Sequence, residues 1–158
     1  MNVLGRCLVV FLLIAEFACR RQLADQPGRR QAPELSPLDV VKIQVYALQH
    51  SNEPTPNAGI WTVYQFASPA NRRVTGPYGH FLQLIKSPGN RPFLNARSAQ
   101  FSDEHRDGSF AEVAVTLEDL EQRRSRFTFS LSLEEAGPFK GCWMTDGVRA
   151  VGTGSKGR

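Results

Sequence analysis

The sequence predicts an α+β fold, in which three N-terminal helices pack on a curved antiparallel sheet of about four strands. In the first half of the domain, apolar residues recur at the spacing of amphipathic helices. In the second half they alternate with polar residues, as in half-buried strands. Because the helices precede the strands, the order is that of an α+β domain, whose sheet must curl around the helices to bury one face. A chain of 158 residues suffices for one domain with a single core.

The first helix is predicted at 37–50. Ser36 stands at the N-cap, Pro37 at the first helical position and Asp39 three residues after the cap, which together form a capping box. The apolar residues that follow lie on one face of a helix: Leu38, Val41, Val45 and Leu48, widened by Ile43 and Tyr46. A loop rich in proline and asparagine follows at 52–59.

The second helix is predicted at 59–67, where most residues are apolar. A strand is the alternative, because β-branched and aromatic residues dominate this segment. The absence of a two-residue alternation favours the helix.

A dense block of cap and turn residues separates the second helix from the third. Ser68 and Pro69 form another cap and first-turn pair, which opens a short turn through Arg72. Thr75-Gly76-Pro77 ends that turn. The third helix is predicted at 77–87, with an apolar face made by Tyr78, Phe81, Leu82 and Ile85.

The remaining pattern is that of strands, predicted at 97–104, 110–117, 126–133 and 141–148. Asp107-Gly108 is a strong hairpin signal between the first two. The segment 126–133 alternates cleanly. Its apolar residues Phe127, Phe129, Leu131 and Leu133 are predicted to be buried, and Thr128, Ser130 and Ser132 to be more exposed.

The two ends of the chain are predicted to lie outside the domain at 36–150. Residues 7–15 form an apolar run that suits a secretory signal and is too short to span a bilayer. We interpret 1–19 as a signal peptide or signal anchor; an organelle transit segment and a non-targeting segment are the alternatives. The protein would then be secreted, membrane-anchored through this leader or organelle-targeted. Residues 20–35 are predicted to be a disordered linker, and 151–158 a flexible tail.

The charge distribution argues against a nucleic-acid partner. The net charge is +4, but residues 36–150 carry twelve Lys or Arg against twelve Asp or Glu. The basic excess therefore lies in the two ends, whereas nucleic-acid binders concentrate it on the domain. Cys142 is the only cysteine of the domain, so no internal disulfide is expected. The histidines His50, His80 and His105 do not stand at metal-ligand spacing, so neither a metal nor a cofactor is predicted.

Several local blocks resemble one small family. These are 35–41, Ala58-Gly59-Ile60, 66–72 with Thr75-Gly76-Pro77, and Gly141-Cys142-Trp143-Met144-Thr145-Asp146-Gly147-Val148. Together they resemble the domain of unknown function 4864 over about residues 35–149. The order of elements is similar to the nuclear transport factor 2-like (cystatin-like) cone. The resemblance implies the fold and leaves the chemistry open.

Two sets of residues are candidates for a site. His80 and Asp146 are the candidate catalytic pair, since a histidine facing the inside of such a cone can act as a general base; the alternatives are a surface histidine and a turn aspartate. Candidate ligand-binding residues are Trp61, Tyr64, Arg72, Phe81 and Trp143. The aromatic ones fill the core in the alternative reading, and Arg72 either binds an anion or bonds loop carbonyls.

We expect from this a small non-catalytic module that binds a small molecule or a protein partner in a cone-shaped pocket. The alternatives are a small hydrolase or isomerase that uses the His/Asp pair, and a structural or assembly protein. A homodimer with a second copy of the chain is another partner that the sequence allows. Contact with a membrane is expected only through the leader, if it is not cleaved.

Overall fold

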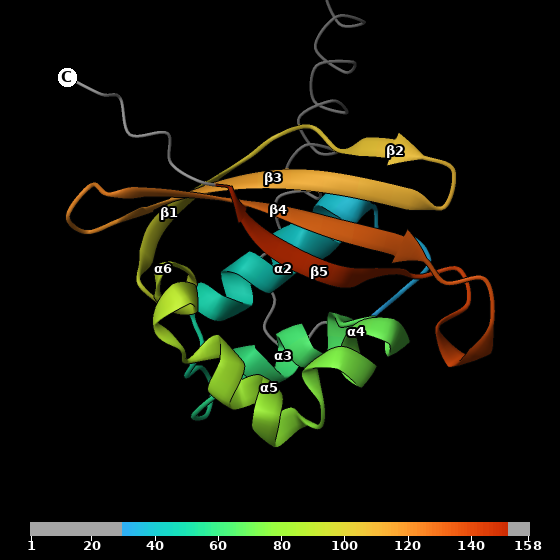
Figure 1. Ribbon diagram of the computed structural model, residues 1–158, viewed down its shortest axis with the longest axis horizontal. Helices are drawn as coiled ribbons and strands as arrows, with labels where there is room; N and C mark the ends of the chain where they lie inside the picture. The colour runs from blue at the N-terminus through green and yellow to red at the C-terminus, as the bar shows by residue number, and fades with distance from the viewer. Residues whose placement is uncertain (1–29, 152–158) are drawn as a thin grey trace, which may run out of the picture.

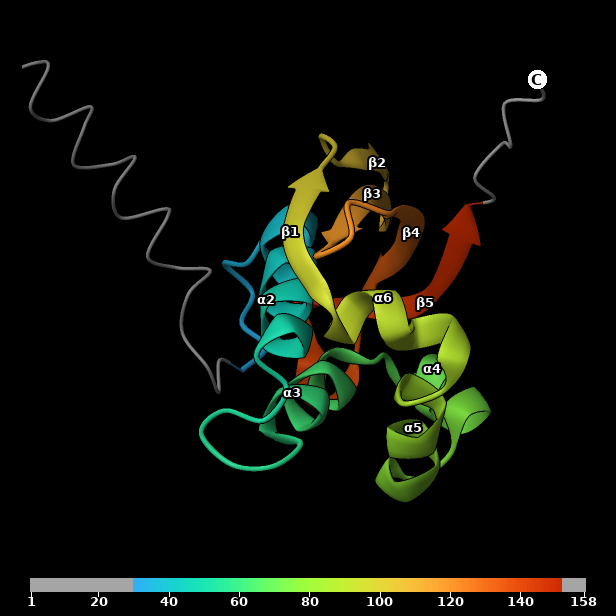
Figure 2. The ribbon, with the colours of Figure 1, turned by 90° about the vertical axis from the view of Figure 1, so that its left-hand side faces the viewer.

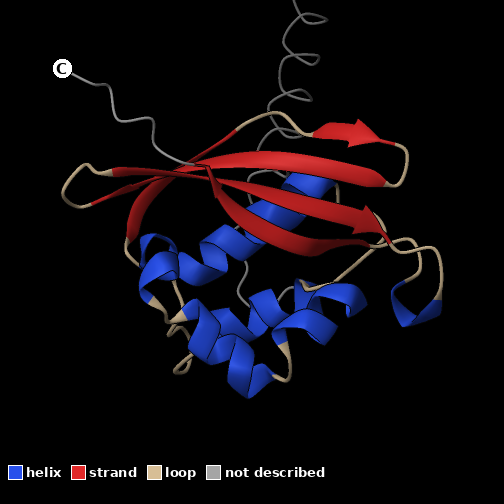
Figure 3. Ribbon diagram, viewed as in Figure 1, coloured by secondary structure: helices blue, strands red, loops and turns tan. Residues whose placement is uncertain are grey.

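A computed structural model describes residues 30–151, and the predicted leader at 1–19 lies outside the described residues. The α+β class is confirmed. Within the described part of the chain, five α-helices lie on one side of a five-stranded antiparallel sheet (Figures 1 and 3). No helix in 30–151 has the length and hydropathy needed to cross a membrane.

Helix α2 (Pro37–Gln49) lies between the sheet and α3. The predicted capping box is present, with the Ser36 side chain accepting from the Asp39 N–H. The helix contacts α3 on one side and β1, β3 and β5 on the other. The close approach of α3 depends on Gly59, because a Cβ atom there would overlap the carbonyl oxygen of Ala47. This requirement explains a glycine in the first turn of α3.

Helices α3 (Ala58–Phe66), α4 (Pro69–Thr75) and α5 (Tyr78–Ile85) gather at one end of the domain (Figure 2). The second helix is therefore confirmed over the strand alternative. The predicted short turn after Ser68 is longer than expected and forms the two-turn helix α4. Its cap is as predicted, because Ser68 Oγ accepts from the Asn71 N–H at 3.1 Å.

A short helical segment that the sequence analysis missed follows α5. It consists of the 3₁₀ turn η1 (Pro88–Asn90) and the helix α6 (Arg91–Leu94). Phe93 on α6 is buried, and its ring centroid lies 4.3 Å from that of Phe127 on the sheet. Four residues are too few for a helical periodicity to show, and Pro88-Gly89 indicated only a loop.

The sheet has the strand order β1-β3-β4-β5, with β2 pairing with β3 beside β1. Its strands are β1 (Ala96–Phe101), β2 (His105–Asp107), β3 (Phe110–Asp119), β4 (Arg124–Leu133) and β5 (Trp143–Val151). The predicted strand at 97–104 is in fact interrupted. Ser102 Oγ accepts from the Ala114 N–H in place of a backbone carbonyl, and the chain leaves the ladder before β2 rejoins it.

One predicted turn of this sheet is present, and one predicted strand end needs correction. The hairpin at Asp107-Gly108 forms, with φ of +58° at Gly108. The last strand begins at Trp143 and not at 141, because Gly141 has a φ of +81° and turns the chain.

The inward face of β4 is as predicted for Phe127, Phe129 and Leu131, which are all buried, while Leu133 at the strand end is half-buried. The prediction for Thr128 was wrong, since it is only 8% exposed. Its strand lies between β3 and β5, and Thr128 is flanked in the register by Ala114 and Arg149. A polar residue on the outer face of an inner strand can thus be covered by its neighbours.

The predicted linker at 20–35 also needs correction where it is described. Leu35 is 3% exposed, and its N–H donates to the Ala32 carbonyl in a turn. The Gln31 side chain donates to the carbonyl of Gln65. The end of the predicted linker therefore packs on the domain, because Leu35 belongs to the hydrophobic core and Ala32 packs against that core.

Candidate functional site

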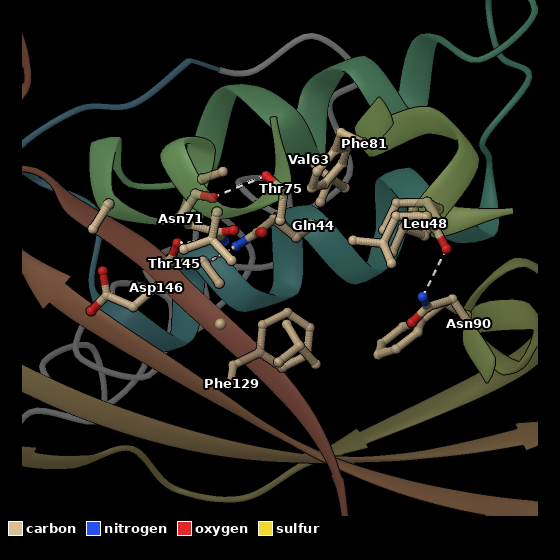
Figure 4. Close-up of a pocket in the computed structure, with 18 residues that line it drawn as sticks. Gln44, Leu48, Val63, Asn71, Thr75, Phe81, Asn90, Phe129, Thr145 and Asp146 are labelled. Carbon is tan, nitrogen blue, oxygen red and sulfur yellow. Dashed lines mark hydrogen bonds between the residues drawn. The ribbon is translucent and has the colours of Figure 1, made fainter. Parts of the chain in front are cut away.

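A cavity of about 430 Å³ lies between the sheet and the helices (Figure 4). Strands β4 and β5 form one wall, and α2 to α6 form the others. Most of the lining is apolar, with a body made by Leu48, Val63, Phe81, Ile85, Phe93 and Phe129. The large side chains come from five different elements, so the cavity exists only in the folded domain.

The cavity has a polar end built from α2, α4 and β5, where Gln44, Asn71, Thr75 and Thr145 cluster (Figure 4). Gln44 is 1% exposed, and its Nε2 donates to the Val40 carbonyl at 3.2 Å and to Thr145 Oγ1 at 2.8 Å. These two bonds fix the orientation of the Gln44 amide, because the group facing the Val40 carbonyl must be the NH₂.

The block after α3 holds this end together. The carbonyl of Thr145 accepts from the Ser68 N–H at 2.9 Å and from Asn71 Nδ2 at 3.0 Å. Ala67 also forms an isolated parallel bridge with Thr145. The start of α4 is thereby attached to β5, which positions both walls of the polar end.

A β-bulge in β5 lies next to this contact. Ser130 pairs with Gly147 and Leu131 with Thr145, so Asp146 is an extra residue on β5. Its carboxylate accepts from Ser132 Oγ at 3.0 Å. Among the lining residues in the described part of the chain, Asp146 is the only one with an ionisable side chain.

The rim of the cavity is apolar and exposed. Val74 on α4, Leu84 on α5 and Val148 on β5 all line the cavity and are 88%, 46% and 45% exposed. Exposed apolar side chains that gather at one opening are typical of a binding site.

The structure does not bring the two candidate catalytic residues together. Asp146 lines the cavity, but His80 is exposed on α5 and is not part of the lining. The His80 ring instead lies against Gly76, where a Cβ atom would be 3.0 Å from Nδ1. The enzyme alternative therefore has no shared cavity for its only acid–base pair.

Of the candidate ligand-binding residues, Phe81 alone lines the cavity. Tyr64 and Trp61 belong to an aromatic cluster with Tyr78, with ring centroids 4.9–5.7 Å apart. Burial within this cluster raises the pKa of the Tyr78 hydroxyl. Trp61 is 45% exposed and lines a second hollow of about 320 Å³ on the other side of α3.

The last aromatic candidate, Trp143, is 6% exposed and belongs to the core. The guanidinium of Arg106 covers its ring at 5.4 Å from the centroid. Trp143 therefore has the structural role that the alternative reading assigned to it.

Arg72 makes structural contacts. Its Nη2 donates to the Gln65 carbonyl at 2.6 Å, and its guanidinium lies 5.1 Å from the Tyr64 ring centroid and 5.4 Å from that of Phe139. Nε is buried and has no hydrogen-bond partner in the described structure. These contacts favour the carbonyl-bonding alternative over the anion site.

Sequence reasoning missed the polar end of the cavity, although one signal pointed to it. Gln44 stands within the apolar face of the first helix, three residues after Val41 and four before Leu48. A polar residue at such a position must be buried with a partner. The partner, Thr145, is 101 residues away and could not be identified from spacing.

The described residues contain no cluster of three potential metal ligands. Comparisons with protein-family models, with curated proteins and with solved structures found no match. The resemblance to domain of unknown function 4864 and to the cone folds therefore stays a prediction.

Proposed function

We propose that the protein is a non-catalytic module that binds a small, neutral, mostly apolar molecule in the cavity between its helices and its sheet. The observation that carries this proposal is the cavity itself. Its volume of about 430 Å³ falls within the range of small-molecule sites. A dry apolar cavity of about 150 Å³ accepts benzene, so by proportion this one has room for roughly 15–20 non-hydrogen atoms.

The lining supports a neutral ligand. Asp146 is the only ionisable lining residue among 30–151, and Ser132 already donates to its carboxylate. An anionic ligand would lose its hydration and meet only this negative charge, which is costly in an apolar environment. A cationic ligand could pair only with Asp146, at one end of an otherwise uncharged lining. An apolar ligand would instead gain free energy from burial against side chains such as Phe129 and Phe81.

The rim supports access from solvent. Val74, Leu84 and Val148 provide a continuous apolar path from the surface to the interior. They come from three elements, so the opening lies where α4, α5 and β5 meet.

The proposal is tested with the full-length protein and the neutral dye N-phenyl-1-naphthylamine, whose fluorescence rises in apolar surroundings. We expect a saturable rise with one site per chain. Val63→Phe places a ring in the cavity and should weaken binding at least tenfold. Leu120→Phe adds a ring to a turn residue that is 75% exposed and outside the lining, and it should leave binding unchanged.

Two results would overturn the proposal. One is the absence of saturable binding to the folded wild-type protein. The other is equal binding by the wild type and by a folded Val63→Phe variant, which would place the dye elsewhere.

A further inference from the structure

We propose that the cavity selects ligands with one neutral group that both donates and accepts a hydrogen bond, a hydroxyl in the simplest case, held between Gln44 and Thr145. This inference rests on the proposed function and adds to it the chemical class of the ligand. The inference is based on the hydrogen-bonding atoms at the polar end of the cavity that have no partner.

The amide of Gln44 leaves its oxygen without a partner. Both protons of Nε2 are used, one by the Val40 carbonyl and one by Thr145 Oγ1. No donor among residues 30–151 bonds Oε1, and this oxygen atom is not completely enclosed by protein atoms. The oxygen of a side chain that is 99% buried is therefore reachable from the cavity that Gln44 lines.

Thr145 contributes the complementary group. Its Oγ1 accepts from Gln44, so the hydroxyl proton remains free, and it has no acceptor among the described residues. Thr145 lies on the inward side of β5, opposite Leu131 in the register, and lines the same cavity. One acceptor and one donor thus stand side by side at the end of an apolar chamber (Figure 4).

The neighbouring polar groups are partly occupied. Ser68 Oγ accepts from the Asn71 N–H, Asn71 Nδ2 donates to the Thr145 carbonyl, and Thr75 Oγ1 donates to the Asn71 carbonyl. Asn71 and Asp146 keep free acceptor atoms, but both side chains are half-buried. Among the fully buried lining residues, the free hydrogen-bonding atoms are therefore Gln44 Oε1 and the hydroxyl of Thr145.

This pair discriminates between neutral groups. A hydroxyl satisfies both atoms, since it donates to Gln44 and accepts from Thr145. An ether or ketone satisfies only Thr145, and a methyl group satisfies neither. Leaving a buried acceptor unpaired costs enough to lower affinity by about 5- to 100-fold. An ammonium would donate to Gln44 but could not accept from Thr145, because it has no lone pair.

The test compares three molecules of nearly equal shape: para-propylphenol, para-propylanisole and para-propyltoluene. Each is titrated against the full-length protein carrying N-phenyl-1-naphthylamine, and displacement is measured. We expect the phenol to bind about 5- to 100-fold tighter than the other two. Gln44→Met and Thr145→Val should each reduce this preference to less than threefold, while Thr145→Ser, which keeps the hydroxyl, should retain it.

The outcomes separate the two proposals. If none of the three molecules displaces the dye and the dye itself does not bind, the proposed function fails. If all three displace it with equal affinity, the ligand-class inference fails and the proposed function stands. Preference for the phenol that persists in folded Thr145→Val and Gln44→Met variants also overturns the inference. The wild-type series decides the question even where one of these variants does not fold.

Discussion

Phe129 offers the most direct test of the packing described above, through the substitution Phe129→Ala. The side chain is 2% exposed on the inner strand β4, and its ring meets that of Phe93 edge-on at 5.9 Å between centroids. Truncating a buried phenylalanine costs about 3–5 kcal/mol. Because Phe129 also lines the cavity, part of its ring already lacks neighbours. We therefore expect a loss near the lower end, about 3 kcal/mol.

The measurement is urea denaturation of the full-length protein, followed by circular dichroism. With a slope of about 2 kcal/mol per M, the expected loss lowers the midpoint by about 1.5 M. If the alanine variant is already unfolded without urea, Phe129→Leu gives a smaller readable loss of about 1–1.5 kcal/mol.

Phe110→Ala is the matched control. It removes the same ring from the neighbouring strand β3, at a position that is 62% exposed. Its loss should stay below about 0.5 kcal/mol, as for surface substitutions. A loss under about 1 kcal/mol for Phe129→Ala, or equal losses for the two variants, would refute the assignment of the two sheet faces.

Three further substitutions or reactions probe other contacts. Gly59→Ala should cost more than about 3 kcal/mol or prevent folding, because the new Cβ would overlap the backbone of α2. The control Gly79→Ala, at a position with open space around it, should change the thermal midpoint by less than about 3 °C. Similar midpoints for the two variants would contradict the close contact between α2 and α3. Ser68→Ala should lower the free energy of unfolding by about 1 kcal/mol and the thermal midpoint by about 3–6 °C, and Arg72→Ala should also lower the midpoint. Unchanged stability in both variants would favour the anion-site alternative for Arg72. Burial, and then the carboxylate of a nearby glutamate, raises the pKa of the Cys142 thiol. In a variant whose other cysteines are serine, iodoacetamide at neutral pH should therefore alkylate Cys142 at least tenfold more slowly in the folded than in the urea-unfolded protein. Equal rates would show that the thiol is accessible.

The elements with strong local signals were predictable. The capping box at Ser36 and the clean alternation of 126–133 each encode their structure within a few neighbouring residues. The same holds for the cap at Ser68 and the turn at Gly108. Elements whose stability comes from distant contacts were missed. Helix α6 has only four residues and is held by Phe93 packing on the sheet.

The candidate site was less predictable than the fold. Of the residues chosen for their chemistry, Phe81 and Asp146 line the cavity, whereas His80 is exposed outside it. Aromatic residues are large and apolar, so they serve a core and a pocket equally well, and composition cannot separate the two. The direction of each side chain depends on the angle at which its helix crosses the sheet.

Local patterns predicted the α+β class, the main helices and the inward face of β4, because caps, turns and hydrophobic periodicity act over a few residues. The neutral charge of the domain follows from its composition. The position of the cavity and the polar atoms that face it depend instead on how distant elements pack. Gln44 and Thr145 are 101 residues apart and meet because α2 packs against β5. Such a meeting depends on the whole set of packed contacts, which no local pattern records.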